Sequence, residues 1–151
     1  MTTTGAQIPA PTTWSRSSVL AITPVWRVGA LAAVVAAAAT TLFALGAKAL
    51  DVPLEVDGEA IPMIAFAYIT LWWSAVGTVV AALLARRAKR PARTFVVTTL
   101  VLTALSFVPP LTTDHIDTAT RVTLSLSHVV AAVIVISALA ARLSQVPQAR
   151  Q

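Results

Sequence analysis

The chain has 151 residues, of which 57% are hydrophobic and only 11% are charged, and its mean hydropathy is +0.81. A soluble domain carries about 25% charged residues, so this composition excludes a water-soluble globular domain and an intrinsically disordered chain. The complete lack of cysteine excludes a disulfide framework and cysteine-ligated zinc or iron–sulfur sites. The composition therefore predicts an integral membrane protein.

The first 25 residues, 1–25, are rich in Thr, Ser and Pro and predict a flexible polar N-terminal tail. The first uncharged block follows at 28–47, between Arg27 and Lys48, and its length of about 30 Å matches a bilayer core. The pattern Ala47-Lys48-Ala49 resembles a signal-peptide cleavage site. The apolar run is longer than the roughly 7–15 residues of a signal peptide, so we favour a spanning helix.

Three further apolar blocks predict three more membrane-spanning helices, at about 61–85, 94–111 and 122–141. The second block begins with Pro62 in its first turn, where a missing amide proton costs nothing. The sequence does not fix the last residue of the third helix, because Pro109 and Pro110 interrupt helical hydrogen bonding there. Residues 26–143 thus form a predicted four-helix transmembrane domain, followed by a C-terminal tail at 144–151.

Short connections make neighbouring helices antiparallel, so the sequence predicts an all-α, four-helix bundle with both termini on one side of the membrane. In this arrangement nine basic residues lie on the side of the termini and two lie on the other side. Because basic residues concentrate in cytoplasmic segments, we expect cytoplasmic termini and a multi-pass protein of the cell (inner) membrane. The carboxylates all fall in the two outer loops: Asp51, Glu55, Asp57, Glu59, Asp114 and Asp117.

The predicted spans contain no Asp, Glu, Lys or Arg. Ion-coupled carriers depend on an ionisable group inside the membrane, so this absence counts against the small multidrug carriers. The spans therefore also leave no paired carboxylates and no catalytic triad, and glycine-rich phosphate loops are absent, so we do not expect an enzyme. A transporter subunit that becomes complete only as an oligomer stays as the alternative function.

One imidazole, that of His128, falls inside a span, about 9 Å below the outer end of the fourth helix. Tyr68, Thr41 and Ser106 reach a similar depth from the other helices, and Ser125 lies one turn before His128. One interpretation is a polar pocket, closed by Tyr68, that binds a small or lipid-like ligand. The other is an interhelical hydrogen-bond strut made by His128, which we favour. An intramembrane enzyme using His128 and Tyr68 is the weakest hypothesis, because a second activated group is missing.

The loops contain two further candidate sites. Asp114, His115 and Asp117 carry groups that bind divalent metals, but their loose spacing favours a solvated acidic loop. A haem needs a second axial histidine at the depth of His128, so we expect no cofactor. The loop between the second and third helices contains five basic residues, Arg86, Arg87, Lys89, Arg90 and Arg93. Their charge suits anionic lipid head groups. The role of basic residues in membrane topology already explains their presence. This run is too short for a nucleic-acid site.

Two features of the spans concern helix packing. Gly29, Ala33 and Ala37 recur every four residues, which allows helix backbones to approach closely. The adjacent Trp72 and Trp73 lie near the membrane centre, away from the interfaces where tryptophan is enriched. Because adjacent side chains of a helix point about 100° apart, we expect one indole to face lipid and the other to pack inside.

Three strings resemble a family of small four-helix membrane proteins of unknown function, found mainly in actinobacteria. They are Trp26-Arg27 before the first span, Pro109-Pro110 after the third, and the segment from Leu124 to Ala132. The resemblance covers about residues 24–143 and implies the four-helix fold without an activity. Abundant alanine, more arginine than lysine and no asparagine fit a GC-rich genome.

We therefore predict a non-enzymatic inner-membrane protein that is structural or accessory, or that binds a small or lipid-like ligand. Its expected partners are the lipid bilayer and either another membrane protein or a second copy of the chain.

Overall fold

The computed structural model describes residues 23–108 and 116–145. Within these ranges the chain forms four helices, α2 (Thr23–Ala49), α3 (Met63–Arg87), α4 (Pro91–Ser106) and α6 (Thr118–Ser144). A short antiparallel hairpin of β1 (Glu55–Val56) and β2 (Glu59–Ala60) lies between α2 and α3. The prediction of a helical chain with four helices is confirmed, and the hairpin is an element that the sequence analysis did not predict.

Three helices are long and apolar enough to cross a membrane: Val25–Ala49 of α2, all of α3 and all of α6. The fourth, α4, has 16 residues, which span about 24 Å, less than the roughly 30 Å of a bilayer core. It begins at Pro91, three residues earlier than predicted, because the first helical position needs no amide proton. The predicted end at Pro109-Pro110 lies outside the described residues.

α2 begins at Thr23, five residues before the expected start at Val28 and inside the predicted N-terminal tail. Two further helix starts also differ from the expected positions. α6 begins at Thr118, since the Asp117 carboxylate caps it by accepting a 2.8 Å hydrogen bond from the Ala119 amide. Pro62 lies before α3 rather than in its first turn, because its extended backbone (ψ 137°) makes it the N-cap residue. Both differences lie at the same end of the molecule, beside the hairpin.

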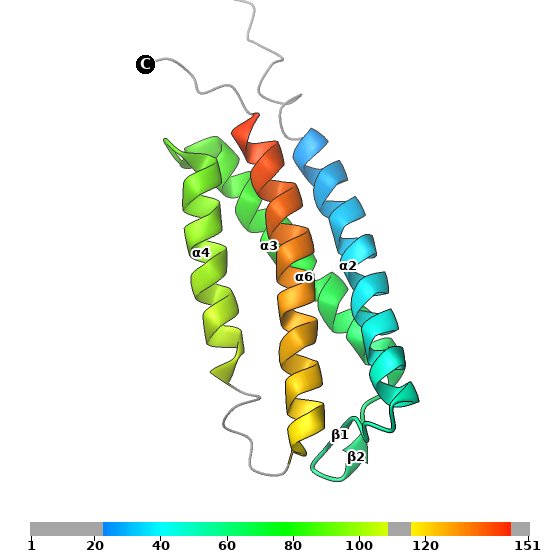
Figure 1. The fold of residues 1–151 in the computed structure, drawn as a ribbon. Helices are drawn as coiled ribbons and strands as arrows, with labels where there is room; N and C mark the ends of the chain where they lie inside the picture. Colours follow the sequence, from blue (N-terminus) through cyan, green and yellow to red (C-terminus); the bar gives the residue numbers. More distant parts are fainter. Residues whose placement is uncertain (1–22, 109–115, 146–151) are drawn as a thin grey trace, which may run out of the picture.

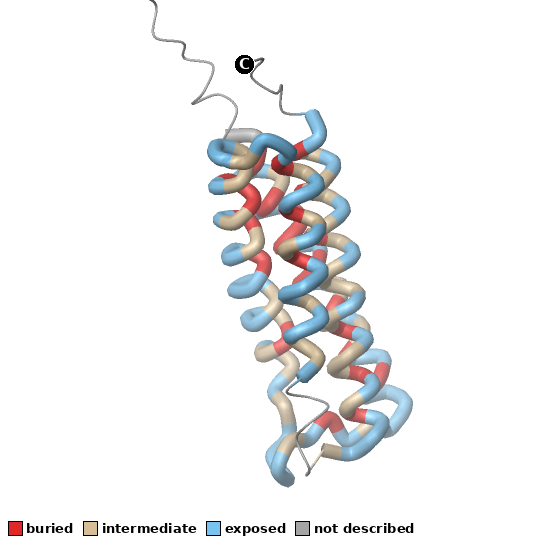
Figure 2. Tube along the Cα trace, turned by 90° about the vertical axis from the view of Figure 1, so that its left-hand side faces the viewer, coloured by how far each residue is buried: buried red, intermediate tan, exposed pale blue. Residues whose placement is uncertain are grey.

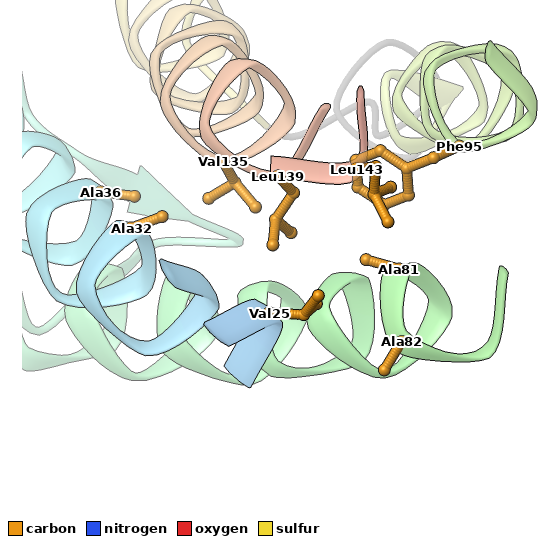
Figure 3. Packing of buried hydrophobic residues seen from close by; sticks show 9 residues of the cluster. All are labelled: Val25, Ala32, Ala36, Ala81, Ala82, Phe95, Val135, Leu139 and Leu143. Carbon is orange, nitrogen blue, oxygen red and sulfur yellow. The ribbon is translucent and has the colours of Figure 1, made fainter. Parts of the chain in front are cut away.

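The helices pack through small residues. α2 lies against α3 and α6, and α4 lies against α6 and α3, with α3 crossing behind α6 from α4 to α2 in Figure 1. In Figure 3, Ala32 and Ala36 of α2 point toward Val135 of α6. Phe95 of α4 and Leu143 of α6 meet in the same buried cluster, which also contains Val25, Ala81, Ala82 and Leu139.

The outer surface of the helices is covered by large apolar side chains. Leu31 of α2 is 69% exposed, Leu100 of α4 is 56% exposed and Val133 of α6 is 62% exposed. Figure 2 shows exposed positions along the outer sides of the helices and buried positions turned toward the neighbouring helices. Small residues inside and large apolar residues outside suit a protein whose solvent is lipid.

The two ends of the molecule differ in charge. The start of α2, the α3–α4 turn and the end of α6 lie together at one end (Figure 1), which we call the cationic end. It carries seven described basic residues and no described carboxylate: Arg27, Arg86, Arg87, Lys89, Arg90, Arg93 and Arg142. The opposite end, which we call the acidic end, contains the hairpin and the five described carboxylates, with Lys48 and Arg121.

Candidate functional site

His128 fills space between α6 and α4. Its Nδ1 lies 2.9 Å from the carbonyl oxygen of Leu124, one turn earlier on the same helix. Because a carbonyl oxygen only accepts, Nδ1 is the donor of this hydrogen bond. The ring faces Phe107 at the C-terminal cap of α4, with ring centroids 6.2 Å apart. His128 therefore contacts α4 through its ring. Its hydrogen bond lies within α6 and is not the interhelical bond that we expected.

The other members of the predicted polar layer do not gather around His128. Tyr68 is 66% exposed, so it points outward and does not close a pocket. Thr41 donates to the Ala37 carbonyl at 2.8 Å, and Ser106 donates to the Thr103 carbonyl at 2.7 Å, each within its own helix. Ser125 is half-buried on α6, one turn before His128. Short hydroxyl side chains reach the preceding turn of their helix before they reach a neighbour.

Buried hydroxyl groups elsewhere in the described helices follow the same rule. Thr78 donates to Ser74, Thr99 to Phe95 and Ser127 to Thr123, at 2.7–2.8 Å in each case. One pair crosses between helices, Thr40 of α2 and Thr70 of α3, with hydroxyl oxygens 3.0 Å apart. No buried side-chain nitrogen or oxygen of the described residues lacks a hydrogen-bond partner. The described interior is therefore satisfied without a ligand.

The predicted metal ligands fall mostly outside the described structure. Asp114 and His115 lie among residues 109–115, which are not described. The carboxylate of Asp117 caps α6 through the Ala119 amide. Among the described residues, no group of three or more His, Asp or Glu side chains is arranged to hold a metal ion.

The basic loop forms the α3–α4 turn at the cationic end. Arg86 and Arg87 occupy the last turn of α3, and Arg90 is the N-cap residue of α4 without a side-chain capping bond. All five predicted lipid-contacting side chains are exposed: Arg86, Arg87, Lys89, Arg90 and Arg93. The structure thus brings these five residues together on one solvent-facing turn.

At the acidic end, the sequence analysis missed a buried segment centred on Leu54, which we call the Leu54 plug. Leu54 is 2% exposed and packs in a cluster with Ala44, Ala47 and Phe66. Its amide donates to the Thr120 hydroxyl of α6 at 3.1 Å, and its carbonyl accepts from the Ile61 amide at 2.8 Å. This segment ties the loop between α2 and α3 to the start of α6.

In the sequence, the dipeptide Asp57-Gly58 indicates a hairpin turn next to this segment. Both residues have positive φ, 54° and 78°, as the two central residues of a tight hairpin turn require. Leu54 itself has φ 50°, a left-handed conformation that carries strain in a residue with a branched apolar side chain. Asp-Gly predicts the hairpin, whereas nothing in the sequence marks Leu54 as its anchor.

Both indoles in the middle of α3 face outward. Trp72 is 60% exposed and Trp73 is 65% exposed, so the expectation that one of them packs inside is wrong. The inward face of this part of α3 is taken by the small Ser74 and Thr78, which allow α2 to approach. Neither indole has a hydrogen-bond or ring partner among the described residues.

Comparison with known proteins places the chain in a family. The model of DUF6069, a family of unknown function, matches residues 20–145, which include all four helices and the hairpin. No curated protein and no solved structure matches the chain. The actinobacterial origin stays a prediction. Because the match covers well over half of the 151 residues, the chain belongs to the DUF6069 family of proteins of unknown function.

Proposed function

We propose that this chain is a multi-pass, non-enzymatic protein of the inner membrane, with cytoplasmic termini, that serves as an accessory partner of another membrane protein. The exposed indoles Trp72 and Trp73 of α3 are the observation that carries the accessory role. The partner would cover these two side chains within the membrane and provide a hydrogen-bond acceptor for an indole N–H.

The orientation follows from the distribution of charge. The cationic end carries seven described basic residues, and the acidic end carries two described basic residues and five carboxylates. Basic residues near the ends of spanning helices stay in the cytoplasm. The cationic end, with the start of α2 and the end of α6, therefore faces the cytoplasm.

A pair of reporter fusions tests this orientation. Alkaline phosphatase, which is active only outside the cytoplasm, is expected to be inactive when it is fused after Gln151. The same reporter inserted after Gly58, in the exposed hairpin turn of the acidic end, is expected to be active. Activity at Gln151 together with inactivity at Gly58 would reverse the orientation.

Three observations support a role without catalysis. The middle sections of the described helices carry no Asp, Glu, Lys or Arg side chain, and their only imidazole is that of His128. The Nδ1 of His128 is engaged by its own helix. Buried hydroxyl groups are likewise bonded, mostly within their own helices. A reaction needs groups that converge on a substrate, and the described polar groups are instead directed at backbone carbonyls.

The position of the two indoles supports a protein partner rather than lipid alone. Trp72 lies about 14 Å from the start of α3 and about 22 Å from its end, counting 1.5 Å per residue. An indole N–H is left unsatisfied in hydrocarbon, which is why tryptophan concentrates at the membrane interfaces. Two outward-facing indoles at mid-depth are therefore best accommodated against a neighbouring helix that offers an acceptor.

Photo-crosslinking in cells tests the accessory role. A photoreactive phenylalanine at Trp72 or Trp73 is expected to give an adduct with one and the same membrane protein. Control positions at similar depth on other helices, counted from the acidic end, are Leu42 of α2 (68% exposed) and Val129 of α6 (42% exposed). Both are expected to give no such adduct. The double variant Trp72→Leu/Trp73→Leu, which stays apolar, is expected to reduce co-purification of that protein at least tenfold.

Two outcomes would overturn the proposal. Adducts between two copies of this chain at Trp72 and Trp73 would indicate a symmetric oligomer instead of an accessory subunit. Equal labelling at all four positions, or labelling of lipid alone, would show that the indoles face the bilayer.

A further inference from the structure

We propose that the α3–α4 turn at the cationic end is a binding site for an anionic phospholipid of the cytoplasmic leaflet. The site comprises the basic side chains of the turn and the apolar residues of α3 that lead up to it. This inference concerns a lipid ligand and does not depend on the accessory role of Trp72 and Trp73.

The charge of the turn has no counterpart in the described structure. Five basic side chains occur within eight residues: Arg86, Arg87, Lys89, Arg90 and Arg93. All five are exposed, and none of them has a side-chain hydrogen bond or ion pair with another described residue. The five described carboxylates all lie at the opposite end of the molecule. The basic side chains of the turn are therefore free to pair with an external anion.

The start of α4 adds to the positive potential of the turn. Arg90 is the N-cap residue without a side-chain capping bond, and Pro91 occupies the first turn. The amides of Ala92 and Arg93 consequently have no partner within the helix. The helix dipole places partial positive charge at this same point. A phosphate group at the turn would meet both full and partial positive charges.

The apolar surface next to the turn points to a lipid rather than to a soluble anion. Val76, Val79 and Leu83 are 37%, 43% and 47% exposed, and Arg86 continues the same spacing of three and four residues. Residues at this spacing share one face of a helix. An acyl chain would lie along this stripe while its phosphate reaches the arginines, which matches the shape of a phospholipid with its head at the interface.

Binding of defined lipids to the delipidated, full-length protein in detergent tests the proposal. Native mass spectrometry is expected to show that phosphatidylglycerol binds more tightly than phosphatidylcholine with the same acyl chains. The double variant Arg86→Gln/Arg87→Gln is expected to raise the Kd for phosphatidylglycerol roughly thirtyfold, since each basic residue contributes about 1 kcal/mol and 1.4 kcal/mol is tenfold.

A charge-matched control separates a site from a general electrostatic attraction. Arg27→Gln/Arg142→Gln removes the same charge from the same end of the molecule, but away from the α3–α4 turn. This control is expected to change the Kd less than threefold, and a phosphatase insertion after Gly58 confirms that both variants keep their orientation. Equal losses in the two variants would overturn the proposal, as would equal affinity for the two lipids. Competition by glycerol phosphate at the same concentration as the lipid would reassign the turn to soluble phosphates.

Discussion

Replacing Gly29 with alanine is expected to lower the free energy of unfolding by about 1–3 kcal/mol, the usual cost of overpacking a buried contact. Gly29 lies where α2 packs closely against Thr78 of α3. A Cβ atom there would stand 2.9 Å from Cβ of Thr78 and would also clash with both ends of that branched side chain. Thr78 is 3% exposed, and its hydroxyl is bonded to the Ser74 carbonyl, so it has little room to move. The measurement is an unfolding titration with SDS in mixed micelles, followed by circular dichroism.

The same helix offers a matched control, Gly46→Ala. A Cβ at Gly46 meets nothing within 4 Å, so this variant is expected to be as stable as the native chain or slightly more stable. Thr78→Ala removes the two atoms nearest to a methyl group at position 29 and leaves only the contact with Cβ at 2.9 Å. The double variant Gly29→Ala/Thr78→Ala is accordingly expected to be more stable than Gly29→Ala alone. Equal stability of the Gly29→Ala and Gly46→Ala variants would show that α2 and α3 separate without penalty.

This contact is one that sequence reasoning could predict. The spacing of Gly29, Ala33 and Ala37 indicates a surface for close approach, and all three residues are buried in the structure. The composition and the length of the apolar blocks likewise predict the helices, because lipid imposes a simple length requirement on any spanning segment. The spacing of these small residues does not predict which residue they contact. Thr78 lies on another helix, and the register between the two helices depends on the whole packing arrangement.

The polar layer around His128 shows where prediction from depth alone stops. Thr41, Ser106 and His128 reach similar depths along their helices, which predicts a shared polar layer. Depth along a helix axis does not determine the direction of a side chain, which changes by about 100° per residue. Tyr68 therefore faces outward, and the hydroxyls bond carbonyls of their own helices. Trp72 and Trp73 illustrate the same point, since small residues at Ser74 and Thr78 already fill the inward face of α3.

The Leu54 plug could not be predicted because it combines long-range contacts with unusual backbone geometry. Its hydrogen bond joins residues 66 positions apart in the chain. Its left-handed conformation is rare for leucine, so propensities point away from it. Packing against Phe66, Ala44 and Ala47 compensates for the strain. A residue held in this way is expected to matter strongly for stability.

Leu54→Ala is expected to lower the free energy of unfolding by about 2–5 kcal/mol, because it empties a buried site at the acidic end. Leu54→Gly is expected to be no less stable than Leu54→Ala. Glycine adopts φ near 50° without strain, which offsets its greater loss of entropy on folding. At an ordinary buried position glycine is the worse of the two replacements, so a much lower stability of Leu54→Gly would contradict the strained conformation.

Variants of Thr120 test the hydrogen bond from the Leu54 amide separately from the packing of the Leu54 side chain. Thr120→Val keeps the shape of a fully buried side chain but removes the acceptor, so the amide is left unsatisfied, at a cost of about 1–3 kcal/mol. Thr120→Ser keeps the acceptor and is expected to lose less. Hydrogen exchange of residues 50–62 is expected to accelerate in Thr120→Val and to stay near the native rate in Thr120→Ser. If exchange is the same in both variants, the Thr120 hydroxyl does not hold this loop, and packing of Leu54 alone anchors it to α6.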